Sequence, residues 1–182
     1  MPGPRHNEGM GDADFALTTH ELRAVVRFAT ECAEGLLPHF EAVAPDDSRP
    51  RDAITAARAF ADGAARSNLQ RTTAFAAHRA GKTVAPEAAQ LAALACGDAA
   101  AAAYLHPIAR ASQIGHILRA AACAARVAEL AGEPDDACVR MLADRADSTL
   151  PGVLRRYPPA PSGGSRVAQL MSELDAVIRQ RP

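Results

Sequence analysis

Tryptophan is absent from this 182-residue chain, tyrosine occurs twice and phenylalanine five times. Aromatic and β-branched residues favour strands, so their scarcity argues against a β-sheet. Alanine, the strongest helix former, makes up about a quarter of the residues. The composition therefore predicts an all-α fold in which small side chains let the helix axes approach closely.

An excess of charge of either sign is also missing. Twenty Lys and Arg side chains oppose 21 Asp and Glu side chains, and Lys82 is the only lysine. No overall field therefore selects nucleic acid or an anionic membrane, and we expect neither as a partner. The alanine-rich run 91–105 is too short and too weakly apolar to span a bilayer, and no signal peptide is visible in residues 1–14. We therefore expect a cytoplasmic protein.

Motifs of catalytic chemistry are lacking as well. The chain contains no glycine-rich phosphate loop, no Ser-His-Asp signature, no HExxH and no CxxC. We expect no catalytic residue and no cofactor, and we interpret the four cysteines as buried, reduced thiols. We expect no zinc site at His106, His116, Cys96 and Cys123, because their spacing matches no established zinc pattern.

Helical periodicity predicts a compact, alanine-rich bundle of six to eight helices without a sheet. The apolar faces of residues 112–131 cover most of the helix circumference, which predicts a central helix. Residues 1–14 are rich in Gly, Pro and charge, and we expect a disordered tail. Residues 15–182 then form a single domain, with an irregular Pro/Gly linker at about 157–165 before the last helix.

Several residues mark helix ends. Thr18 and Glu21 predict a capping box at the start of the first helix, and Pro38 is expected to end that helix. Ser67 and Ser112 are the expected N-caps of two later helices.

Asp98 is the most informative polar residue. It lies at the centre of an apolar helix face formed by Leu91, Leu94, Ala95, Ala102 and Leu105. A carboxylate that faces a core costs several kcal/mol unless it is paired or protonated. We therefore expect a partner, either His116 or an arginine of a neighbouring helix. The favoured interpretation is a buried clamp that sets helix packing, and the alternative is a ligand-binding carboxylate.

Three histidines are candidates to join Asp98 in a small-molecule site. His116 lies on an apolar helix face, His106 stands at a joint between two helices, and His78 is on a partly exposed helix side. Each also has an ordinary structural explanation, as a core, loop or surface residue. The site hypothesis predicts that Asp98 and at least two of these histidines converge within hydrogen-bond or metal-ligand reach in one pocket.

A polar strip on the helix that starts near Pro50 is a candidate protein-contact surface. It consists of Arg51, Thr55, Arg58 and Asp62. A solvated helix face would have the same pattern, so both interpretations stay open.

Six segments together carry a family resemblance: residues 48–54 (SRPRDAI), 60–63 (FADG), 76–80 (AAHRA), 96–107 (CGDAAAAAYLHP), 116–121 (HILRAA) and 153–161 (VLRRYPPAP). In this order they resemble the putative immunity protein family of actinobacteria, over about residues 15–180. Gly81 and Gly115 depart from the pattern, because a better helix former would be expected at both positions.

The resemblance implies an all-helical domain of the immunity type. Together with the missing catalytic motifs, it favours a non-enzymatic protein-interaction domain whose partner is an unidentified cognate protein, a toxin in the immunity interpretation. The alternative function is a small-molecule or metal-binding helical protein with a site around Asp98 and the histidines. A homodimer formed through an alanine-rich or C-terminal helix face is compatible with either function.

Overall fold

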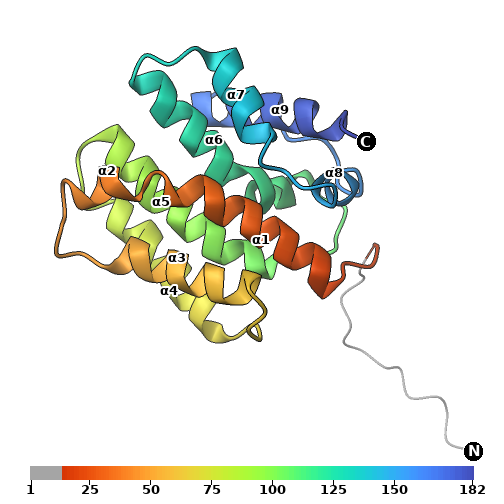
Figure 1. Ribbon diagram of the computed structural model, residues 1–182, viewed down its shortest axis with the longest axis horizontal. Coiled ribbons are helices and arrows are strands. Elements are labelled where there is room, and N and C mark those ends of the chain that lie inside the picture. The colour runs from red at the N-terminus through yellow and green to blue at the C-terminus, as the bar shows by residue number, and fades with distance from the viewer. Residues whose placement is uncertain (1–13) are drawn as a thin grey trace, which may run out of the picture.

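The computed structural model describes residues 14–182, apart from the side chains of residues 135 and 136, and in this range the chain forms helices and no strand. The predicted all-α class is confirmed. The helices are α1 (Thr19–Glu34), α2 (Leu37–Glu41), α3 (Arg49–Ala61), α4 (Asn68–Gly81), α5 (Glu87–Ala101), α6 (Ile114–Leu130), α7 (Asp135–Ala143), α8 (Leu150–Leu154) and α9 (Arg166–Arg179), with 3₁₀ turns η1 (Ala102–Tyr104) and η2 (Ala111–Gln113) around the joint before α6 (Figure 1).

Helix α5 lies at the centre of the bundle. It contacts α1, α2, α3, α4 and α6, whereas α6 contacts α1, α5, α7 and α9. Figure 1 shows the resulting layers, with α3 and α4 on one side of α5 and α7 and α9 beyond α6. Most of α5 is buried, including the charged residue Asp98 in its second half. The sequence predicted α6 as the central helix, but α5 is enclosed by more of the other helices because its side chains are smaller.

The helix starts were predicted well where a side chain caps the backbone. Thr18 and Glu21 form the expected capping box, and Ser67 forms a capping box with Gln70. Two other predictions were wrong. Helix α1 ends before Pro38, which instead lies in the first turn of α2, where a missing N–H costs nothing. Ser112 lies inside η2 rather than at the cap of α6.

Tyr157 and Asp14 connect irregular segments to the bundle. The Tyr157 hydroxyl donates to the carbonyl of His106 at 2.9 Å, and its ring meets Phe15 edge to face. Asp14 accepts a hydrogen bond from the Ala109 N–H at 2.6 Å. Asp14 is therefore attached to the joint before α6, although the sequence placed it in the tail; the rest of that predicted tail, residues 1–13, lies outside the described residues.

The four cysteines are buried, as predicted. Burial raises the pKa of Cys32 and of Cys96 to about 12 and raises that of Cys123 further, so these thiols stay protonated at neutral pH. We expect the native protein to react with a thiol reagent at least about a hundredfold more slowly than free cysteine. Denaturation should release all four thiols, and a native thiol that reacts at the rate of free cysteine would contradict this burial.

Candidate functional site

Asp98 forms the buried centre of a charged cluster. Its side chain is 1% exposed and accepts two hydrogen bonds from Arg119 of α6, from Nε at 2.6 Å and from Nη2 at 2.5 Å. The Nε2 atom of His78 in α4 lies 3.1 Å from the same carboxylate. We call Asp98, Arg119 and His78 the carboxylate clamp. It joins α4, α5 and α6 through one side chain.

The predicted partner of Asp98 was His116 or an arginine of a neighbouring helix. The arginine prediction is confirmed by Arg119, whereas His116 makes no hydrogen bond with Asp98. The histidine that does pair is His78, which the sequence placed at a partly exposed position. Its side chain is 27% exposed, so one edge faces solvent while Nε2 reaches inward.

Gly97 explains how His78 reaches the carboxylate. A Cβ atom added at Gly97 would lie 2.2 Å from Cδ2 of His78 and 3.0 Å from the carbonyl oxygen of Ala74. The first distance is too short for a real contact, and the second is tighter than most real contacts. The absence of a side chain at this position therefore makes room for the imidazole ring between α4 and α5.

The charges within the clamp support one another. Burial alone would raise the pKa of Asp98, but the hydrogen bonds from Arg119 and His78 lower it below its ordinary value. The hydrogen bonds between Arg119 and Asp98 raise the pKa of Arg119. The carboxylate is therefore ionised at neutral pH, and Arg119 and His78 satisfy it through a bidentate and a single contact.

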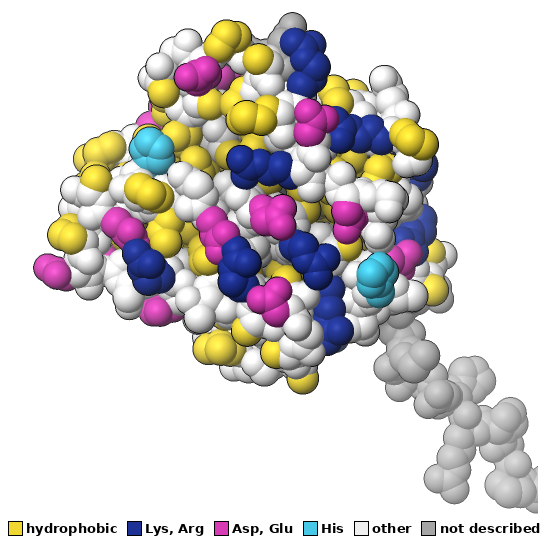
Figure 2. All heavy atoms as spheres, viewed as in Figure 1, with side chains coloured by type: hydrophobic (Ala, Val, Ile, Leu, Met, Phe, Trp, Pro, Cys, Tyr) yellow, Lys and Arg dark blue, Asp and Glu magenta, His cyan; other side chains and the backbone are white. Residues whose placement is uncertain are grey.

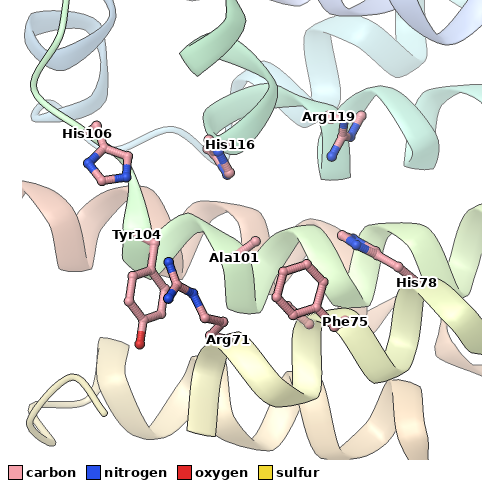
Figure 3. A pocket seen from close by; sticks show the side chains of 9 residues that line it. Arg71, Phe75, His78, Ala101, Tyr104, His106, His116 and Arg119 are labelled. Atoms are coloured by element: carbon pink, nitrogen blue, oxygen red, sulfur yellow. The ribbon is translucent and has the colours of Figure 1, made fainter. Parts of the chain in front are cut away.

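A pocket of about 250 Å³ opens beside the clamp, between α4 and α6. Figure 3 shows Arg71 and Phe75 extending from α4, and His116 and Arg119 extending from α6. Tyr104 and His106 lie at one end of the pocket, and His78 lies toward the other. The Tyr104 hydroxyl donates to the carbonyl of Ser67 at 2.7 Å, which holds its ring in place.

The structure thus brings the three predicted histidines to the wall of one pocket, but of these three His78 alone bonds to Asp98, which lies beneath the pocket. His116 is mostly buried there, and its Nδ1 atom is buried without a hydrogen-bond partner. Burial is the largest influence on the pKa of His116 and lowers it, although the charge of Asp98 opposes this effect. Within the described part of the chain, no three His, Cys, Asp or Glu side chains are arranged to hold a metal ion.

Sequence reasoning missed four residues of this site: Arg71, Phe75, Tyr104 and Arg119. A signal was present on α4, because positions 71, 75 and 78 follow the helical repeat and share one side. That side was interpreted as a solvated surface. The facing helix α6 turns the same side into one wall of a pocket.

The predicted contact strip on α3 lies on a different surface. Arg51 bonds to Glu41, and Arg58 Nε donates to Glu34 at 2.8 Å. The bond to Glu34 raises the pKa of Arg58. Figure 2 shows basic and acidic side chains interspersed over this face of the molecule. Two members of the strip are therefore already paired within the chain, while Asp62 is exposed.

These features define an all-α protein with an open basic and aromatic pocket above a buried carboxylate clamp. A family model described as "Imm-5 like putative immunity protein" matches residues 16–151, and the chain belongs to this family. A search of curated proteins and a search of solved structures each find no match. No helix within residues 14–182 is both long enough and apolar enough to cross a membrane.

Proposed function

We propose that this protein is a non-enzymatic immunity protein that binds a cognate toxin and thereby neutralises it. The observation that carries the proposal is membership of the Imm-5-like family over three quarters of the chain. We propose the cytoplasm as the compartment, because buried thiols such as those of Cys32, Cys96 and Cys123 suit reducing conditions. The actinobacterial source expected from the sequence stays a prediction.

The outer face of α4 is the surface that we propose for toxin contact. Leu69 and Phe75 are 54% and 58% exposed, which is unusual for large apolar side chains. Arg71 and Arg79 are exposed on the same helix, and α4 contains no acidic residue. Aromatic and arginine side chains are enriched at the centres of protein interfaces. This face therefore supplies an apolar anchor and positive charge for an acidic partner.

The α3 strip is the alternative contact surface. Its arginines are engaged by Glu34 and Glu41, so a partner would have to displace or share these ion pairs. Exposed ion pairs contribute little binding free energy. We therefore expect a smaller contribution from Arg51, Arg58 and Asp62 than from Phe75.

Co-expression tests the proposal directly. A toxin domain encoded beside this gene is expected to stop growth of a bacterial host, and co-expression of the wild-type protein is expected to restore growth. Phe75→Ala should weaken toxin binding by about 30-fold or more, which corresponds to loss of an interface anchor. The double variant R51A/R58A is the matched control on α3 and should bind within about threefold of wild type.

Persistent growth arrest beside a folded wild-type protein would contradict neutralisation. Normal binding by Phe75→Ala together with lost binding by R51A/R58A would move the contact surface to α3. Light scattering on the same samples measures the mass of the free protein and of the complex, which also tests the predicted homodimer.

A further inference from the structure

The pocket between α4 and α6 has an uneven charge. Five of its lining side chains are Arg or His, and none is Asp or Glu. The Asp98 carboxylate is buried below the pocket and already satisfied by Arg119 and His78. Asp98 is therefore already paired at one end of the pocket. Arg71, His106 and His116 remain at the other.

Polar groups at that other end lack an acidic partner. Arg71 forms no ion pair in the described structure, and its guanidinium lies 5.0 Å from the centre of the Tyr104 ring. This stacking restrains the arginine before any ligand arrives. His116 presents a buried Nδ1 atom without a partner, and an unsatisfied buried polar group is costly. An anion that accepts hydrogen bonds from these groups would satisfy them.

The apolar part of the pocket sets a second requirement. Phe75 and Ala101 line it between the two polar ends (Figure 3). The pocket volume of about 250 Å³ is the volume that roughly eight water molecules occupy in the liquid. A ligand of about ten non-hydrogen atoms fits this space, which is smaller than a typical drug-sized site.

We propose that this pocket binds a small organic anion with a planar apolar body and a carboxylate or phosphate group. The anionic group faces Arg71, His106 and His116, and the body packs on Phe75. The carboxylate clamp acts as a positioning unit, because Asp98 holds Arg119 and His78 at the inner end. Anion binding here does not rest on toxin neutralisation, although Arg71 and Phe75 also belong to the α4 face proposed for toxin contact.

Calorimetric titration of the full-length chain tests the proposal with four probes: benzoate, phenyl phosphate, inorganic phosphate and the neutral benzyl alcohol. We expect saturable binding of benzoate and phenyl phosphate, at least about tenfold weaker binding of inorganic phosphate, and none of benzyl alcohol. Absence of binding by both aromatic anions would overturn the proposal. Equal binding of benzyl alcohol would also overturn it, because the site would then not select charge.

Variants locate the site. Arg71→Ala should weaken phenyl phosphate binding by about tenfold or more, the effect of one charge-assisted contact. Arg79→Ala is the matched control, since Arg79 is an exposed arginine of the same helix outside the pocket. Phe75→Ala should weaken phenyl phosphate but leave inorganic phosphate unchanged. Equal losses in R71A and R79A would overturn the proposed site, because they would indicate nonspecific surface charge.

Discussion

Replacement of Asp98 by asparagine is expected to lower the free energy of unfolding by about 3 kcal/mol, the effect of removing one partner from a buried ion pair. Asp98 is 1% exposed and bonded to both Arg119 and His78. The amide cannot accept both guanidinium bonds with a full charge, so Arg119 loses its counterion. For a domain of this size, the melting temperature should fall by roughly 6–12 °C. Urea unfolding and thermal melts measure both quantities.

Asp62→Asn is the matched control for this substitution, because Asp62 is exposed at the C-cap of α3. It should change the free energy of unfolding by less than about 0.5 kcal/mol. An equally small effect of Asp98→Asn would show that the clamp does not hold the helices together.

The same interaction has a pH dependence of known sign. The pKa of Asp98 is lowered in the folded protein, so its ionised form stabilises the fold above the unfolded pKa of about 3.9. That stability is lost as the pH falls through the lowered folded value. The difference in stability between wild type and Asp98→Asn should therefore be complete at neutral pH and shrink below about pH 4.

Gly97→Ala is expected to destabilise the protein by about 2 kcal/mol, even though alanine is the better helix former. The new methyl group would overlap the His78 ring and press on the carbonyl of Ala74. The ring can move, but the backbone of α4 cannot move without disturbing the clamp. Loss of the bond between His78 and Asp98 should shift the His78 imidazole signals in NMR spectra.

Gly115→Ala is the control for the glycine substitution. A Cβ at Gly115 would meet nothing closer than Arg119 Nη1 at 3.7 Å, an ordinary contact. Its backbone φ is not positive, so alanine should be neutral or stabilising by up to about 1 kcal/mol. If both variants behave alike, the close approach of α4 and α5 at Gly97 does not govern stability.

The inward position of Asp98 was predictable, because its place on an apolar helix face depends only on local periodicity. The choice among its partners was not. Arg119 was one of several arginines that the prediction allowed, and His78 had the pattern of a partly exposed residue. The pairing depends on how α4 and α6 lie against α5, which a helical repeat within one segment does not specify.

The glycines also show which features the sequence predicts and which depend on helix packing. The sequence marked Gly81 and Gly115 as unusual, yet passed over Gly97, where the close contact with His78 occurs. A glycine inside a helix has the same local cost wherever it lies. Whether a glycine is needed for close packing can be told only when the position of the neighbouring helix is known.

By itself, the sequence determined the all-α class, the capped starts of α1 and α4, the burial of the cysteines and the inward carboxylate, because propensity, capping and periodicity act within a few residues. The family resemblance was likewise present in the order of its short segments. Only the tertiary structure decided that α5 is the enclosed helix and that His78 completes the clamp. It also decided that three histidines from separate segments line one pocket, since their convergence depends on packing between distant parts of the chain.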